Sequence, residues 1–208
     1  MLEGIKKLHF VGIGGVGMSA IAEVMLDKGY EISGSDLSES AVVKHLKAKG
    51  ATIYKGHDAL NVEGKEALVL SSAIHQDNPE LVAAKAKGLK LFHRSDILAY
   101  LLNDAKGIAV AGAHGKTTTS SMISVVLEHA KVDPTILIGG FVDYLKGNAK
   151  LGKSDYLVAE ADESDGSFLK FYPKIAVVTN IEDDHMDHYG SMENIIKINK
   201  LGYYYGEG

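Results

Sequence analysis

The residues best suited to chemistry are Gly112-Ala-His-Gly-Lys-Thr-Thr-Thr119, which follow the apolar run 108–111. Gly-Lys-Thr at the start of a helix is typical of a phosphate-binding loop. Backbone N–H groups surround the phosphates, Lys116 reaches the β- and γ-phosphates, and Thr117 can coordinate Mg²⁺. The loop is shorter than the usual G-x-x-x-x-G-K-[ST] pattern, because Val110 occupies the position of the first glycine. A chance Gly-Lys-Thr at a helix N-cap is the alternative, but the preceding apolar run favours a nucleoside triphosphate site.

A second glycine-rich segment, Gly12-Ile-Gly14-Gly-Val-Gly17, fits the pattern G-x-G-x-x-G, and Asp36 follows roughly 20 residues later. In this context glycines let the backbone approach a diphosphate, and the N-terminus of the next helix attracts its negative charge. The acidic residue can accept a hydrogen bond from a ribose hydroxyl. The pattern predicts a diphosphate site and, taken alone, favours NAD. A tight turn between a strand and a helix, without a ligand, is the alternative.

Carboxylates and imidazoles follow two later apolar runs. The first group begins at Glu160, and the second begins at Asn180 and contains His185 and His188. The carboxyl ends of parallel strands meet at one edge of a sheet, so these side chains are expected beside the triphosphate loop, where they suggest Mg²⁺. A solvated loop is at least as good an explanation for Asp162, Glu163, Asp165, Glu182 and Asp183. A zinc site at His185 and His188 has only their spacing in its favour.

Short apolar runs alternate with amphipathic stretches along the chain. Strands are predicted at 8–13, 30–33, 67–71, 89–92, 108–111, 135–138, 155–160 and 175–179, and helices at 16–28, 40–49, 80–87, 96–102 and 116–129. This alternation predicts an α/β fold with parallel sheets built from βαβ units. We expect a Rossmann-like domain over residues 1–104 and a P-loop-type α/β ATPase domain over residues 105–208, although no linker composition marks the boundary.

Composition narrows the class of protein. The 208 residues are 46% hydrophobic, and 22 basic and 27 acidic residues give a net charge of −5. The absence of cysteine excludes disulfides and thiolate metal sites. The sequence shows neither a basic patch for nucleic acid nor an apolar stretch of the ~20 residues that a membrane span needs, and it lacks the pattern of a signal peptide. The sequence therefore predicts a soluble cytoplasmic protein, and it leaves the oligomeric state open.

Six segments together resemble the Mur ligases of peptidoglycan synthesis, in the order that this family has them. They are 12–19 (GIGGVGMS), 33–36 (SGSD), 71–80 (SSAIHQDNPE), 111–119 (AGAHGKTTT), 159–168 (AEADESDGSF) and 179–189 (TNIEDDHMDHY). One departure is that Ala113 stands where the family often has threonine. The resemblance implies that the first glycine loop binds the UDP of a sugar substrate and not NAD.

The resemblance also implies roles for individual residues. UDP-sugar binding would fall to Gly14, Gly15, Val16, Gly17, Ser35, Asp36, His75 and Asn78. ATP would be bound by Gly112, Ala113, His114, Gly115, Lys116, Thr117, Thr118 and Asn180. Lys116, Glu160 and His185 would be catalytic, and Thr117, Glu160 and His185 would hold Mg²⁺.

The implied reaction is ATP-dependent joining of L-alanine to the carboxylate of UDP-N-acetylmuramate through an acyl phosphate. The family is longer and has a further C-terminal domain, and residues 198–208 do not resemble its continuation. The resemblance therefore predicts a truncated chain that does not ligate by itself. The alternatives are a related ligase that adds a ready-made peptide, an NAD(P)-dependent oxidoreductase, and a non-catalytic fragment that binds nucleotide sugars.

Overall fold

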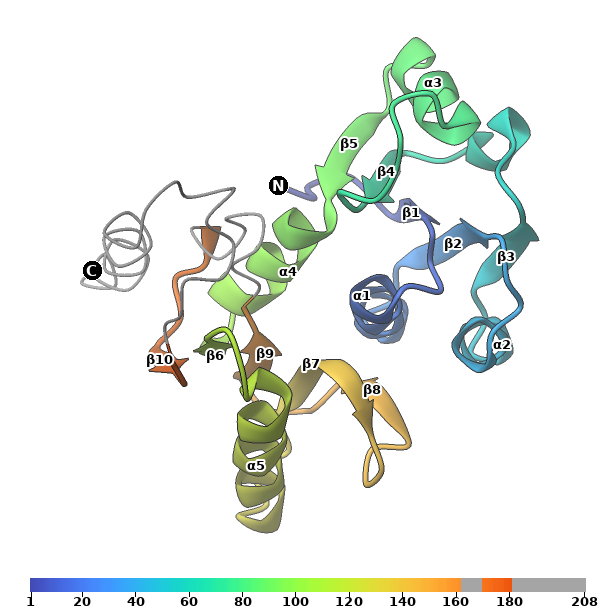
Figure 1. Ribbon diagram of the computed structural model, residues 1–208. Helices are drawn as coiled ribbons and strands as arrows, with labels where there is room; N and C mark the ends of the chain where they lie inside the picture. The colour runs from blue at the N-terminus through green and yellow to red at the C-terminus, as the bar shows by residue number, and fades with distance from the viewer. Residues whose placement is uncertain (162–169, 181–208) are drawn as a thin grey trace. The chain divides into compact units, whose positions relative to one another are not determined.

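The computed structural model describes residues 1–161 and 170–180. The chain divides into two compact units, Met1–Ile97 and Leu98–Gly208, and each has its own β-sheet (Figure 1). The division falls inside helix α4 (Arg94–Asn103), whereas the sequence analysis expected a boundary just after this helix. The α/β class predicted from the sequence is confirmed.

The sheet of the first unit contains five parallel strands in the order β3-β2-β1-β4-β5. Their bounds are β1 (Lys7–Val11), β2 (Glu31–Asp36), β3 (Thr52–Lys55), β4 (Ala67–Leu70) and β5 (Lys90–His93). The central strands β1 and β4 are almost wholly buried, as expected for a parallel sheet covered on both faces. The sequence analysis missed β3, because its residues at the sheet edge form no apolar run.

Local sequence signals place the helices of this unit, α1 (Val16–Asp27), α2 (Ala41–Ala48), the short 3₁₀ helix η1 (Ala59–Val62) and α3 (Pro79–Ala86). The Ser40 hydroxyl accepts a hydrogen bond from Val43 N at the start of α2. Right-handed crossovers put α1 and α2 on one face of the sheet and α3 on the other. In Figure 1, α1 and α2 lie near β1–β3, and α3 lies beside β4 and β5. The strand order reverses beside β1, which is where α/β sheets bind ligands.

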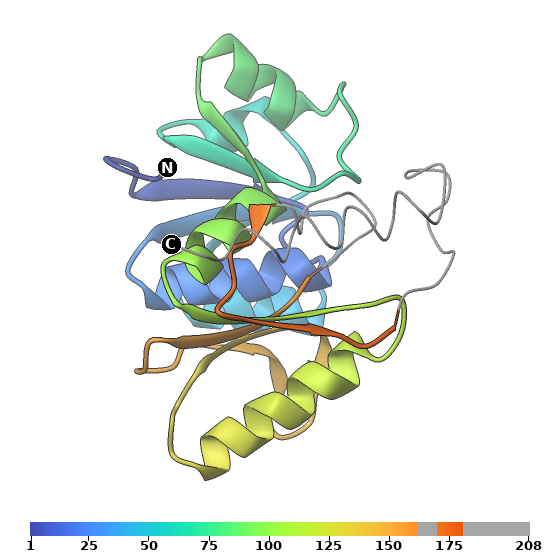
Figure 2. The same cartoon turned by 90° about the vertical axis from the view of Figure 1, so that its left-hand side faces the viewer.

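The second unit has the strand order β10-β6-β9-β7-β8. The bounds are β6 (Lys106–Ala111), β7 (Thr135–Val142), β8 (Gly147–Lys150), β9 (Tyr156–Glu160) and β10 (Ile175–Val178). Helix α5 (Lys116–His129) runs along one face of this sheet (Figures 1 and 2). The strands of this sheet pair in parallel except β8, which pairs antiparallel with β7. The sequence of β8, Gly-Asn-Ala-Lys, has no apolar pattern that could have predicted a strand.

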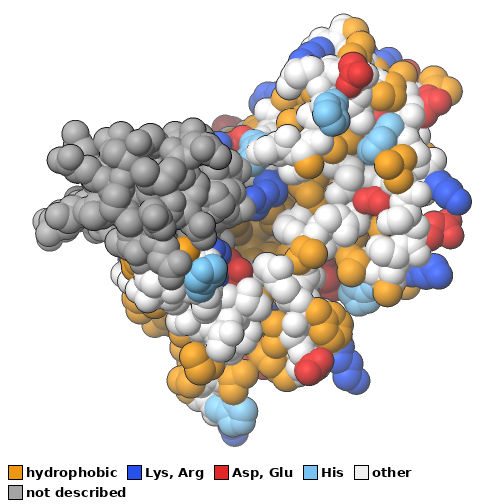
Figure 3. Space-filling view, in the orientation of Figure 1, with side chains coloured by type: hydrophobic (Ala, Val, Ile, Leu, Met, Phe, Trp, Pro, Cys, Tyr) orange, Lys and Arg blue, Asp and Glu red, His pale blue; other side chains and the backbone are white. Residues whose placement is uncertain are grey.

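Charged side chains of both signs are interspersed on the visible face of the first unit (Figure 3). This distribution agrees with the mixing of acidic and basic residues along the sequence. Within residues 1–161 and 170–180, no helix combines the length and apolar character needed to cross a membrane.

Candidate functional site

The triphosphate loop predicted from the sequence connects β6 to α5. Gly112 has a φ of 129°, and Gly115, the residue before α5, has a φ of 81°, so both occupy a region of backbone conformation that favours glycine. The Lys116 Nζ donates a hydrogen bond of 2.5 Å to the Gly112 carbonyl and one of 3.4 Å to the Ala113 carbonyl. The ammonium group therefore lies against the loop backbone at the start of α5, where the loop would receive phosphates.

The two residues that follow β10, Thr179 and Asn180, form hydrogen bonds with this loop. The Asn180 side chain accepts from His114 N at 3.0 Å and donates to His114 O at 3.1 Å, so a single amide pairs with both polar backbone groups of one loop residue. The Thr179 hydroxyl lies 2.6 Å from His114 O and 3.2 Å from Ala111 O. Asn180, predicted to lie near the nucleotide, thus contacts the triphosphate loop directly.

Glu160 ends β9 beside the first turn of α5. The buried Ser120 hydroxyl links the two elements, because it lies within hydrogen-bond distance of Lys116 O, Thr117 O and, at 3.2 Å, Glu160 Oε1. The sequence analysis missed Ser120, although its place one turn beyond Lys116 was a signal.

Two glycines of β7 bring the backbone of this strand close to the side chains of Glu160 and Thr117. A Cβ on Gly139 would lie 2.6 Å from Glu160 Oε2, and a Cβ on Gly140 would lie 3.2 Å from Thr117 Cγ2. The sequence analysis also missed this pair. Glycine at both positions lets the strand approach Thr117 and Glu160, the two described residues that were predicted to hold a metal.

The remaining predictions for this unit differ in their outcome. His114 is exposed, its backbone N–H donates to the Asn180 side chain, and its carbonyl accepts from the Thr179 hydroxyl. Thr118 is exposed on the first turn of α5. His185 and the other acidic and histidine residues at 162–165 and 182–188 lie outside the described residues.

The first glycine loop follows β1 in the other unit. Gly12 N and Ile13 N both donate to Ser35 O on β2, and Gly14 N donates to Asp36 Oδ2 at 2.8 Å. A Cβ on Gly14 would lie 2.7 Å from that oxygen. The other oxygen, Asp36 Oδ1, accepts from the Ser38 amide and hydroxyl. Asp36 therefore fixes the loop, a role in addition to the ribose contact predicted for it.

The end of the loop carries a positive charge that the sequence analysis did not single out. The Arg94 Nη1 would lie 3.4 Å from a Cβ on Gly17, in the first turn of α1. Val16 and Gly17 begin this helix, and the N-terminal end of a helix carries a partial positive charge. A guanidinium beside a helix N-terminus favours an anion at this point.

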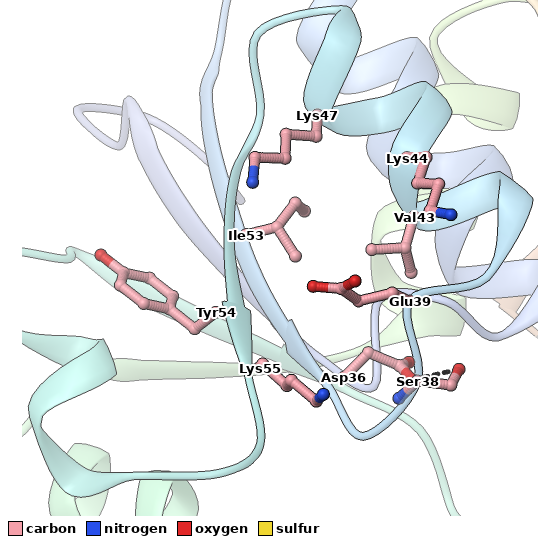
Figure 4. Close-up of a pocket in the computed structure, with 9 residues that line it drawn as sticks. All are labelled: Asp36, Ser38, Glu39, Val43, Lys44, Lys47, Ile53, Tyr54 and Lys55. Atoms are coloured by element: carbon pink, nitrogen blue, oxygen red, sulfur yellow. Dashed lines mark hydrogen bonds between the residues drawn. The ribbon is translucent and has the colours of Figure 1, made fainter.

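A pocket of about 230 Å³ opens beside Asp36 (Figure 4). The apolar side chains of Val43 and Ile53 and three lysines contribute to its wall, which in full comprises Asp36, Ser38, Glu39, Val43, Lys44, Lys47, Ile53, Tyr54 and Lys55. Because Asp36 also contacts Gly14, the pocket adjoins the glycine loop.

The segment after β4 also reaches this loop, since a Cβ on Gly12 would lie 3.6 Å from Ile74 Cδ1. His75, the next residue, is exposed. The Asn78 side chain caps α3 by accepting from Glu80 N at 2.9 Å and Leu81 N at 3.3 Å. The substrate contacts predicted for His75 and Asn78 stay predictions.

Glu80 of α3 is a fully buried carboxylate of the first unit. It accepts hydrogen bonds from His9 Nε2 at 3.2 Å, Asn61 Nδ2 at 2.7 Å, Ser35 Oγ at 2.7 Å and His57 Nδ1 at 2.8 Å. Burial opposes ionisation of Glu80, but these hydrogen bonds from His9, Ser35, Asn61 and His57 outweigh it and lower its pKa to about 2.

Because the pKa of Glu80 is lowered in the folded chain, we expect the folded state to lose stability in acid. Because the pKa of Glu80 in the folded chain lies below its ordinary value of 4.5, its contribution to stability is full above pH 4.5 and disappears as the pH falls toward 2. We expect Glu80→Gln to be less stable than wild type at pH 7, with the difference narrowing below pH 4.5. Urea unfolding between pH 7 and pH 3 measures this, and a constant difference would contradict it.

Two family models match the chain. Residues 7–116 match the family described as Mur ligase family, catalytic domain, and residues 110–201 match the Mur ligase middle domain. UDP-N-acetylmuramate–L-alanine ligases from Dictyoglomus turgidum and Pelotomaculum thermopropionicum are 55% and 56% identical over 190 and 191 residues. These matches cover 91% and 92% of this chain and 41% of each relative. The chain thus spans about two fifths of the length of these relatives.

Solved structures show the same likeness. The UDP-N-acetylmuramate-alanine ligase of Thermotoga maritima matches 94% of this chain and 46% of its own, with 34% identity and a TM-score of 0.87. A ligase from Neisseria meningitidis that joins UDP-N-acetylmuramate to L-alanyl-γ-D-glutamyl-meso-diaminopimelate matches 95% of this chain and 67% of its own, with 29% identity and a TM-score of 0.85. These proteins are ligases, and nothing in them supports the oxidoreductase alternative.

Proposed function

Since the chain belongs to the Mur ligase family, we propose that it serves the ATP-dependent joining of L-alanine to UDP-N-acetylmuramate in the cytoplasm. The observation that carries the proposal is the contact of Lys116 and Asn180 with one glycine loop, together with the contact of Glu160 with Ser120 in the helix that follows this loop. The alanine-adding relatives support the choice of amino acid. Identity to the solved alanine ligase is also higher than to the peptide ligase, at 34% against 29%.

In the proposed reaction, a muramate carboxylate oxygen attacks the γ-phosphorus of ATP, and the bond to the β-phosphate oxygen breaks to release ADP. The L-alanine amine then attacks the carbonyl carbon of the acyl phosphate, loses a proton, and expels inorganic phosphate. Lys116 would leave its loop carbonyls to neutralise the β- and γ-phosphates, while loop amides orient them. Asn180 would keep the loop in place by holding both backbone groups of His114.

The oxygen donors beside the loop fit a magnesium ion. Thr117 offers a hydroxyl and Glu160 a carboxylate, and both side chains lie close to the backbone of β7 at Gly140 and Gly139. Oxygen ligands of this kind, together with substrate phosphates, are what Mg²⁺ prefers. A bound Mg²⁺ would offset the charge that develops on the phosphoryl oxygens. His185, the third predicted ligand, stays a prediction.

The first unit would hold the UDP-sugar. The diphosphate would lie at the loop formed by Gly14, Gly15, Val16 and Gly17, where Arg94 adds a positive charge. The adjoining pocket, with Val43 and Ile53 in its wall, would take the uridine. Its apolar side chains suit the faces of a base.

Calorimetry on the whole 208-residue chain tests this function. We expect binding of UDP-N-acetylmuramate and of ATP with Mg²⁺, and no binding of NADH at comparable concentrations. Binding of NADH without binding of UDP-N-acetylmuramate would overturn the proposal. UDP-N-acetylglucosamine, which lacks the lactyl carboxylate, serves as the matched ligand for the contribution of that group.

Replacing Arg94 by alanine is expected to weaken UDP-N-acetylmuramate binding tenfold or more, because a hydrogen bond to a charged group contributes about 1.5–3 kcal/mol. Arg94→Lys keeps the charge but not the planar fork and should lose less. ATP binding in the second unit serves as the internal control and should not change. Calorimetric titrations measure both, and equal affinity of Arg94→Ala and wild type for the UDP-sugar would contradict the prediction.

A further inference from the structure

His93 joins strand β5 directly to helix α4, because β5 ends at His93 and α4 begins at Arg94. The His93 Nδ1 accepts a hydrogen bond from Ser95 N at 3.3 Å. In the other direction, His93 N donates to Asp96 Oδ2 at 2.8 Å. The residue before the helix and the first turn of the helix thus satisfy each other's backbone N–H groups, as in a capping box. A histidine here takes the place of the usual Ser, Thr, Asp or Asn.

The cap determines where the His93 ring carries its hydrogen. A backbone N–H can only donate, so Nδ1 must be an unprotonated acceptor, and the neutral ring carries its hydrogen at Nε2. The Ser72 Oγ lies 3.1 Å from Nε2 and accepts this hydrogen. The Ser95 Oγ lies 2.7 Å from Nδ1 and donates to it as well. His93 therefore bonds to the segment after β4 through one nitrogen and to the first turn of α4 through the other.

Arg94 follows the cap immediately and is the first residue of α4. Both its stem and its guanidinium lie against the first turn of α1, since a Cβ on Gly17 would lie 3.8 Å from Arg94 Cδ and 3.4 Å from Nη1. A helix that loses its N-cap is destabilised at its first turn. The position of the Arg94 side chain, and with it the positive charge at the glycine loop, therefore depends on the cap.

We propose that His93 is a positioning residue for UDP-sugar binding, which caps α4 and thereby keeps the Arg94 guanidinium at the diphosphate loop. The proposal rests on the proposed function of the first unit. In this role His93 acts through Arg94 and need not touch the ligand. What the position requires is a hydrogen-bond acceptor for the Ser95 N–H, which asparagine can supply and alanine cannot.

Nitrogen-15 NMR of the histidine rings tests the cap on the wild-type chain. We expect His93 in its neutral, Nε2-protonated form at neutral pH, because its Nδ1 accepts from the Ser95 N–H. His93→Asn, which lacks the ring, identifies the signal. A ring protonated at Nδ1, alone or together with Nε2, would overturn the proposal.

Calorimetric titration with UDP-N-acetylmuramate tests the positioning role. His93→Ala is expected to bind about fivefold more weakly than wild type, a factor typical of a lost N-cap. His93→Asn keeps an acceptor at the cap and should stay within about twofold of wild type. The matched control is Asp58→Ala, which removes a cap of the same unit, the hydrogen bond of 2.8 Å from Leu60 N to Asp58 Oδ1 at η1. This control should also stay within about twofold.

A double-mutant cycle with Arg94→Ala separates positioning from general stabilisation. If His93 acts through Arg94, His93→Ala has no further effect on UDP-sugar affinity once residue 94 is alanine. The thermal stability should fall on His93→Ala in both backgrounds, because the cap stabilises α4 whichever side chain follows it. Equal losses of affinity in the two backgrounds would refute the positioning role.

The results distinguish this proposal from the proposed function. If wild type binds UDP-N-acetylmuramate and His93→Ala binds it equally well, the positioning role is refuted and the proposed function stands. If wild type does not bind it, both are overturned. Should His93→Ala lack a folded amide spectrum, His93→Asn decides: wild-type affinity supports the role of the cap, and a loss like that expected of the alanine variant refutes it.

Discussion

Replacing Gly112 by alanine is expected to weaken ATP binding by at least 100-fold. A Cβ at this position would lie 2.1 Å from Thr179 Oγ1 and 3.0 Å from both the backbone nitrogen and oxygen of Asn180. The φ of 129° adds backbone strain for any residue with a Cβ. Relief of these contacts would push the end of β10 away from the loop and break its hydrogen bonds with His114. Titration with ATP and Mg²⁺ measures the loss.

Gly147→Ala is the control for the Gly112 variant. It adds the same methyl group in the same unit, and the nearest atom to the new Cβ would be Leu145 O at 3.9 Å. Its ATP affinity should equal that of wild type. Retention of wild-type affinity by Gly112→Ala, in a chain with a folded amide spectrum, would show that the loop does not need this close approach.

Replacing Lys116 by methionine is expected to weaken ATP binding by one to two orders of magnitude. The substitution keeps the apolar stem and removes the ammonium group, whose hydrogen bonds to charged phosphates are worth about 1.5–3 kcal/mol. ADP binding should fall less than ATP binding, because the lysine of a triphosphate loop serves the γ-phosphate as well as the β-phosphate. Comparing the two nucleotides by calorimetry therefore separates loss of a phosphate contact from general damage.

UDP-sugar binding and thermal stability are the controls for the Lys116 variant. The ammonium group bonds to the carbonyls of Gly112 and Ala113 within its own loop, so UDP-sugar binding in the first unit should be unaffected. Thermal unfolding reports any change in stability. Equal losses for ATP and ADP would contradict the assignment of Lys116 to the terminal phosphate.

Local patterns determined much of the fold. The apolar run of β6, the glycines after it and the polar first turn of α5 are neighbours in the chain, so the sequence predicted the strand, the loop and the helix together. The exact bounds predicted for α5 agree with the structure. For α3, the predicted range 80–87 differs by one residue at each end from Pro79–Ala86, and Pro79 at the first position marks the start of the helix. Strands without an apolar run, β3 and β8, gave no such signal.

The first glycine loop shows what a local pattern leaves open. Gly12 to Gly17 and Asp36 predicted a diphosphate site, and the resemblance to Mur ligases replaced NAD by a UDP-sugar. The structure adds that Asp36 already bonds to Gly14 and Ser38. That bond depends on the pairing of β1 with β2, which brings residues 22 positions apart into contact.

The sequence by itself determined the α/β class, the two glycine loops and the likeness to Mur ligases, because each depends on residue types at short spacing. Only the tertiary structure placed Asn180 against His114, Arg94 beside Gly17 and Glu80 between His9 and His57. These partners come from different strands and helices, and Asn180 and His114 are 66 residues apart. Their contacts are set by strand order and by the face on which each helix packs, and neither is encoded in the local periodicity of the chain.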